Sequence, residues 1–130
     1  MKKIKQHLEL IRVIGFISIA LIILILSLVP KPPEIISEFA LSDKLMHLAA
    51  YIALAFSMGF ILPKSFTVKT ITICIIISSS LFGGLIEFLQ GFTGRSPELL
   101  DLVFDTAGAI IGVILYFVFK KITYKLYEKE

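Results

Sequence analysis

Charge and cysteine are both scarce in this sequence of 130 residues. Only 18% of the residues are charged and 57% are hydrophobic, whereas a typical soluble domain has about 25% charged residues. A soluble helical bundle would need polar stripes along its helices, and the first long apolar block has almost none. The only cysteine, Cys74, cannot form an internal disulfide. The composition therefore favours a membrane protein over a soluble one.

The sequence also lacks the patterns of several functional classes. Its net charge is +3, but the basic residues stand at the ends of apolar segments, and no basic patch interleaves with aromatic residues. Nucleic acid is therefore not expected as a partner. No short two-histidine or cysteine motif is present, so neither a metal nor another cofactor is predicted. There is no internal repeat, and nothing indicates the oligomeric state.

Four apolar segments are long enough to cross a bilayer, whose hydrocarbon core of about 30 Å takes about 20 helical residues. The first is too long for a secretory signal and is followed by PKPP, so we expect it to be retained. The sequence predicts an all-α, four-helix transmembrane bundle in a single domain of residues 1–130. The expected spans cover about residues 10–29, 43–62, 67–90 and 99–119.

The connection after the first span is rich in proline. Three prolines within residues 30–33 end the first helix and force an extended chain. Residues 34–41 then predict a short amphipathic helix at the membrane interface. Ser42 or Asp43 is expected to cap the second helix, because a short polar side chain accepts the unpaired N–H groups there.

Lysine and arginine are distributed unevenly between the two ends of the spans. Ten lie in the N-terminal region, between the second and third spans, or in the tail, and only Lys31, Lys44 and Arg95 lie on the other side. Both termini are therefore predicted to be cytoplasmic. Seven of the ten acidic residues fall on or near the opposite face, although acidic residues do not enter the orientation rule. This distribution predicts a polar site that faces outward.

Polar residues at that face follow helical spacing. Gly108 and Gly112 on one helix face let a neighbouring backbone come close. The carboxylates on that same face should therefore point towards protein and not towards lipid. The three sets, each on one helix face, are Asp43, His47 and Tyr51; Gly83, Glu87 and Gln90; and Asp101, Asp105, Gly108 and Gly112.

Ionisable groups at membrane depth are costly, so each suggests a functional site. Arg95 has a planar fork that suits carboxylate or phosphate; it either saturates Glu87 and Asp101 or stays open for a ligand. A binding protein would use the polar pocket to hold an anionic headgroup. The residues predicted to bind a ligand are Asp43, Lys44, Tyr51, Gln90 and Arg95.

Three alternatives remain open, because any one of these residues alone is typical of a helix cap or an ion pair. In an intramembrane enzyme, His47 and Glu87 would act as acid and base, and Asp101 and Asp105 would orient them. The same residues with Asp43 could ligate a divalent cation, although no motif supports a metal. In a structural protein, the cluster would lock the helices together or bind a partner.

Several segments together resemble the VanZ-like family of small bacterial membrane proteins. The family has an Asp-Lys-x-x-His start with a following Tyr, then Glu-x-x-Gln, an Arg, and Asp-x-x-x-Asn with Gly beyond it. This sequence carries an acid at Asp105, where the family usually has Asn. The matching segments are DKLMHLAAY at 43–51, GGLIEFLQ at 83–90, Arg95, and DLVFDTAGAIIG at 101–112.

The resemblance implies a multi-pass protein of the bacterial cytoplasmic membrane. The founding member of the family is associated with resistance to a glycopeptide antibiotic that targets cell-wall precursors. An anionic lipid-linked headgroup of the cell-wall precursor type is therefore an expected ligand, with Arg95 and Lys44 contacting its phosphate. Whether the protein is an enzyme stays open.

Overall fold

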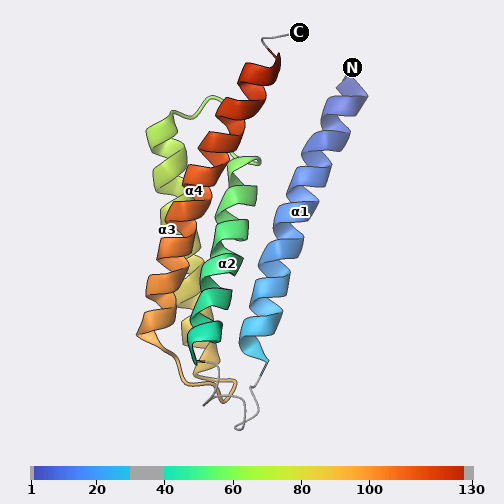
Figure 1. Cartoon of the computed structure of the whole chain (residues 1–130). Coiled ribbons are helices and arrows are strands. Elements are labelled where there is room, and N and C mark those ends of the chain that lie inside the picture. Colours follow the sequence, from blue (N-terminus) through green and yellow to red (C-terminus); the bar gives the residue numbers. More distant parts are fainter. Residues whose placement is uncertain (1, 30–39, 128–130) are drawn as a thin grey trace.

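The structure, a computed structural model, describes residues 2–29 and 40–127. They form four helices that run alternately up and down (Figure 1), and the described residues contain no strand. The predicted all-α fold is confirmed. The helices are α1 (Lys2–Leu28), α2 (Ala40–Gly59), α3 (Val68–Gln90) and α4 (Leu99–Tyr127).

Helices α1, α3 and α4 are each long and apolar enough to cross a membrane. Helix α2, with 20 residues, runs between the same two ends of the bundle (Figure 1). Helix α2 connects the end of the bundle where α1 stops to the opposite end, where α3 begins, so it spans about the same length of the bundle as its neighbours. Most of the predicted connector helix, residues 34–39, lies outside the described part of the chain.

The helix ends differ from the apolar blocks that predicted them. Helix α1 already begins at Lys2, and α4 continues to Tyr127, because polar residues with good helix propensity extend the hydrogen-bonded backbone. Helix α2 begins at Ala40, so the expected cap by Ser42 or Asp43 is wrong. Asp43 instead lies in the first turn, where the helix dipole favours a carboxylate.

Helices α2 and α4 pack with their backbones close together. A Cβ atom added at Gly108 would lie 2.6 Å from the carbonyl oxygen of Leu48, and one at Gly112 would lie 2.6 Å from that of Ile52. Only glycine permits this approach, as the small-residue face of α4 predicted. The close packing also brings the carboxylates on the same face of α4 against α2.

Helix α1 packs less closely than the other three. Most of its side chains are exposed, and Figure 1 shows its N-terminal half standing apart from the bundle. Its C-terminal half contributes Ile23 to a buried cluster with Tyr51, Leu54 and Ile86. The exposed isoleucines and leucines of α1 suit contact with lipid chains.

The orientation of the bundle can be tested with reporter fusions. We expect a periplasmic reporter such as alkaline phosphatase to be active when fused after Gly94, in the turn before α4, and inactive when fused after Lys64, between α2 and α3. We expect this because segments rich in lysine and arginine tend to stay on the cytoplasmic side of the membrane. Activity at Lys64 alone would reverse the predicted orientation.

Candidate functional site

The polar residues gather at the end of the bundle where α1 ends, α2 begins, α3 ends and α4 begins (Figure 1). Side chains that are both polar and buried are concentrated there. Such groups are costly unless they find partners. We therefore consider the hydrogen-bond and ion-pair partners of each residue in turn. The buried members at this end are Ser27, Lys44, His47, Gln90, Asp101 and Asp105.

Lys44 on α2 is held by two carboxylates. Its ammonium group donates hydrogen bonds to Asp101 in the first turn of α4 and to Glu98 just before that helix. The Lys44 and Asp101 side chains are 11% and 4% exposed, so this is a buried ion pair. Glu98 was not among the predicted site residues. Its position after a proline and just before a helix could have indicated it, because acidic residues are favoured at helix starts.

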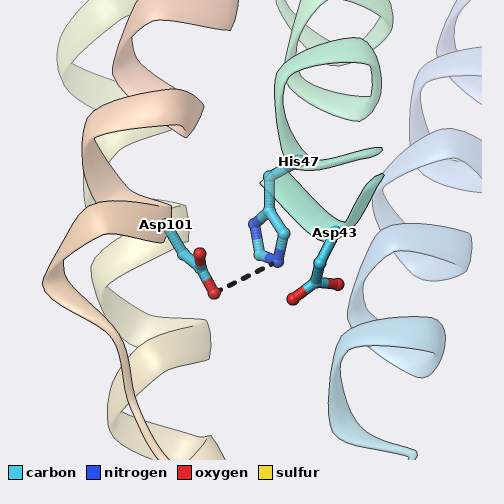
Figure 2. Close-up of side chains that lie close together, drawn as sticks. All are labelled: Asp43, His47 and Asp101. Atoms are coloured by element: carbon cyan, nitrogen blue, oxygen red, sulfur yellow. Dashed lines mark ion pairs between the residues drawn. The ribbon is translucent and has the colours of Figure 1, made fainter. Parts of the chain in front are cut away.

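His47, one turn further along α2, lies between acidic groups. Its Nδ1 atom is 2.9 Å from Oδ1 of Asp105. Its Nε2 atom is 3.6 Å from Oδ2 of Asp101, beyond hydrogen-bond length. Figure 2 shows the ring directed between Asp101 and Asp43. With Nδ1–H donated to Asp105, Nε2 keeps its lone pair and can accept a proton or a metal.

Tyr51 lies one further turn along the same face and is 1% exposed. Its hydroxyl group has no hydrogen-bond partner within the described part of the chain. A Cβ atom at Gly83 of α3 would lie 2.6 Å from Oδ2 of Asp105 and 3.2 Å from the Tyr51 hydroxyl. The glycine therefore makes room for the Asp105 carboxylate between three helices.

Arg95 and Gln90 hold the end of α1. Gln90 donates from Nε2 to the carbonyl oxygen of Ser27 at 3.0 Å. Arg95 donates from Nη1 to the same carbonyl at 2.7 Å and to that of Leu26 at 3.4 Å. These side chains satisfy carbonyl groups that a helix end leaves unpaired. Ser27 takes part through its backbone carbonyl oxygen, and a pattern of side chains in the sequence cannot predict such a contact.

Neither carboxylate that was considered as a partner of Arg95 contacts it among the described residues. Arg95 Nη2 instead lies 3.9 Å from Oδ2 of Asp43. Glu87 accepts the backbone N–H of Glu98 at 2.7 Å, close to the start of α4. The second carboxylate oxygen of Glu87 is buried without a partner in the described ranges. Glu87 thus faces α4 rather than the arginine.

A cavity of about 260 Å³ lies between α1 and α2 beside this cluster. Its wall is mostly aliphatic, while charged and polar groups gather where Arg95 and the start of α2 approach α1. Of the predicted site residues, four line it. The lining includes Ile19, Ile22, Ile23, Leu26, Met46 and Ala50 on the apolar side and Ser27, Asp43, His47, Tyr51 and Arg95 on the polar side.

Acidic groups outnumber cationic ones in the cluster. Among the described residues, the carboxylates of Asp43, Glu87, Glu98, Asp101 and Asp105 lie around two permanent cations, Lys44 and Arg95. Of these carboxylates only Asp101 and Asp105 are buried, and an excess of negative charge near them would be balanced by protons, a cation or water. The arrangement is therefore suited to exchange protons or to bind positive charge.

A membrane protein with a small helical bundle and a carboxylate-rich site at one end is the class that this geometry defines. A comparison with family models specifies it further, because the VanZ/LLP1 family model matches residues 11–120. The chain belongs to the VanZ/LLP1 family. Neither a search of curated proteins nor a search of solved structures gave a match.

Proposed function

We propose that this protein binds a membrane lipid whose anionic, phosphate-bearing headgroup enters the polar end of the cavity. The observation that supports this proposal is the amphiphilic lining of the cavity. Ile19, Ile22 and Leu26 offer a surface for an acyl or prenyl chain, and Arg95 and His47 stand at the other end. A lipid has the same division between a long apolar part and a compact polar one.

Arg95 is the group best suited to meet the headgroup. Its Nη1 atom donates to two backbone carbonyls and its Nη2 atom lies 3.9 Å from Oδ2 of Asp43. The five N–H groups of a guanidinium exceed these contacts, so some remain for a ligand in the cavity that Arg95 lines. Guanidinium groups contact phosphate through parallel hydrogen bonds. Lys44 is a weaker candidate, since Asp101 and Glu98 already hold its ammonium group.

Lipid-linked cell-wall precursors are the proposed ligand class. They carry phosphate on a long prenyl chain. With the orientation that the positive-inside distribution of charge favours, the polar end of the cavity would face the outer side of the bacterial cytoplasmic membrane. All four helices would cross that membrane. By binding or modulating such a precursor, this protein would influence the action of glycopeptide antibiotics, which act on the same molecules.

An enzyme acting on such a lipid is a second candidate, and the His47–Asp105 contact supports it. A histidine oriented by a buried carboxylate can serve as a general base towards a group in the adjoining cavity. Glu87 and Asp101 lie in the same cluster, and the unpaired oxygen of Glu87 could hold a proton for donation.

Lipid binding to the purified full chain tests the proposal. Native mass spectrometry in mild detergent would compare a polyprenyl diphosphate with the polyprenol of the same length. We expect the diphosphate to bind at least about tenfold more tightly, a difference of about 1.4 kcal/mol. Arg95→Gln should remove most of this preference, whereas Arg12→Gln, on α1 over the Phe60 ring and outside the cavity lining, should keep it.

Equal binding of the polyprenol and the diphosphate would contradict the headgroup proposal. The enzyme candidate is separated by incubating the bound lipid and measuring released phosphate. Turnover that is lost in His47→Gln with lipid binding retained would favour catalysis. Binding without turnover would favour the binding function.

A further inference from the structure

Three potential metal ligands come together at the polar end of the cavity. One oxygen of Asp43, one ring nitrogen of His47 and one oxygen of Asp101 all lie within 4.8 Å of one another. Figure 2 shows the three side chains converging from α2 and α4. A mixed set of one imidazole and two carboxylates is a common donor set for divalent first-row metals.

The spacing of the ligand atoms fits a shared ion better than a direct contact. The His47 Nε2 and Asp101 Oδ2 atoms are 3.6 Å apart, beyond a hydrogen bond. Two donors bound tetrahedrally to one metal at about 2.1 Å are about 3.4 Å apart. A small movement of either side chain would therefore place both at bonding distance from one ion.

Two of the three ligands are each held by a group on the far side from the proposed ion. The Nδ1 atom of His47 contacts Asp105, which directs Nε2 towards Asp43 and Asp101. Lys44 holds Oδ1 of Asp101, leaving Oδ2 on the side of the histidine. A carboxylate behind a metal-bound histidine fixes the ring and raises its basicity as a ligand.

The surroundings independently indicate a ligand. Asp43 and His47 line the cavity of about 260 Å³, so an ion would have a route and room for further ligands. Tyr51, one turn beyond His47, lines the same cavity and is 1% exposed. In the part of the chain that the structure describes, more carboxylates than cations lie around the site, which also favours a bound positive charge.

We infer that Asp43, His47 and Asp101 form a binding site for a divalent metal ion such as Mn²⁺ or Zn²⁺. Asp105 and Lys44 position two of its ligands. The ion would supply the positive charge that a phosphate needs among so many carboxylates, and so would bridge the headgroup to the protein. That bridging role rests on the proposed lipid function, whereas the metal site does not.

The metal alone tests the site. Mn²⁺ would be titrated into the purified full chain in lipid-free detergent and followed by electron paramagnetic resonance. We expect one tightly bound ion whose pulsed spectrum shows coupling to an imidazole nitrogen. His47→Gln should abolish that coupling and weaken binding by about 100-fold or more, and Asp105→Asn should weaken it by about 10- to 100-fold.

Glu9→Gln, which removes an exposed carboxylate on α1 far from the cluster, should bind Mn²⁺ as the parent does. Asp43→Asn provides a second ligand variant if His47→Gln does not fold. Bound Mn²⁺ without nitrogen coupling, or binding equal in the parent and the ligand variants, would overturn the inference.

The lipid experiment is then repeated with a chelator and with Mn²⁺. Metal binding without any preference for the diphosphate would leave the metal site intact and defeat the lipid function. Lipid preference that is the same with chelator and with metal would overturn the bridging role alone.

Discussion

Replacing Lys44 with methionine should destabilise the folded bundle by about 3 to 5 kcal/mol. The ammonium group is the cation between Asp101 and Glu98, and its removal leaves the buried carboxylate of Asp101 without its partner. Breaking a buried pair by removing one charge costs about this much, because the remaining charge stays desolvated. Denaturant unfolding in mild detergent, followed by circular dichroism, measures the change.

A double replacement separates the charge effect from packing. Lys44→Met combined with Asp101→Leu removes both charges, and we expect the double variant to be more stable than Lys44→Met alone. Lys64→Met, an exposed lysine between α2 and α3, is the matched control and should change stability by less than about 0.5 kcal/mol. Equal loss in Lys44→Met and the control would show that the buried pair contributes nothing.

Helical spacing predicted which residues share a face, and the structure shows why this worked. Asp43, His47 and Tyr51 recur every four residues and all line the cavity. Gly108 and Gly112 repeat in the same way and meet the backbone of α2. Faces follow from the regular geometry of a helix, which sequence spacing records directly.

Sequence spacing did not predict which residues of different helices contact each other. The sequence left open whether Arg95 pairs with Glu87 and Asp101 or stays available for a ligand. In the structure it lies against α1 and Asp43, because the unpaired carbonyls of that helix end attract its N–H groups. Lys44 took the place beside Asp101. Such pairings depend on how helices rotate and tilt against each other.

The metal question shows the same limit. Two-histidine and cysteine motifs describe ligands on one short segment, and their absence predicted no metal. Asp43 and His47 share one turn of α2, but Asp101 comes from α4 and joins them only through the close packing of those helices. A metal site divided between two helices, as we propose for these three residues, has no local signature in the sequence.

The bundle packs closely between α2 and α4 and less closely along α1. Gly108 and Gly112 fix α4 against α2 and so fix the carboxylates of α4 against His47. Helix α1 is attached mainly at its C-terminal end, by Gln90 and Arg95, and leaves a space along α2. A rigid polar cluster beside a loosely covered apolar wall suits the admission of a lipid from the bilayer.

Filling that space should abolish lipid binding while leaving the polar cluster intact. Ala50→Phe adds a ring to α2 where it lines the cavity opposite α1, so the ring would occupy the region proposed for the lipid chain. We expect at least a tenfold loss of polyprenyl diphosphate binding, or about 1.4 kcal/mol, by native mass spectrometry.

The neighbouring residue supplies the control for this replacement. Ala49 is exposed on another face of α2, and Ala49→Phe adds the same ring towards lipid rather than into the cavity. It should bind the diphosphate as the parent does. Mn²⁺ binding should persist in both variants, since Asp43, His47 and Asp101 are unchanged, and this also reports that the bundle has folded. If Ala50→Phe keeps full lipid affinity with Mn²⁺ bound, the lipid chain does not lie between α1 and α2.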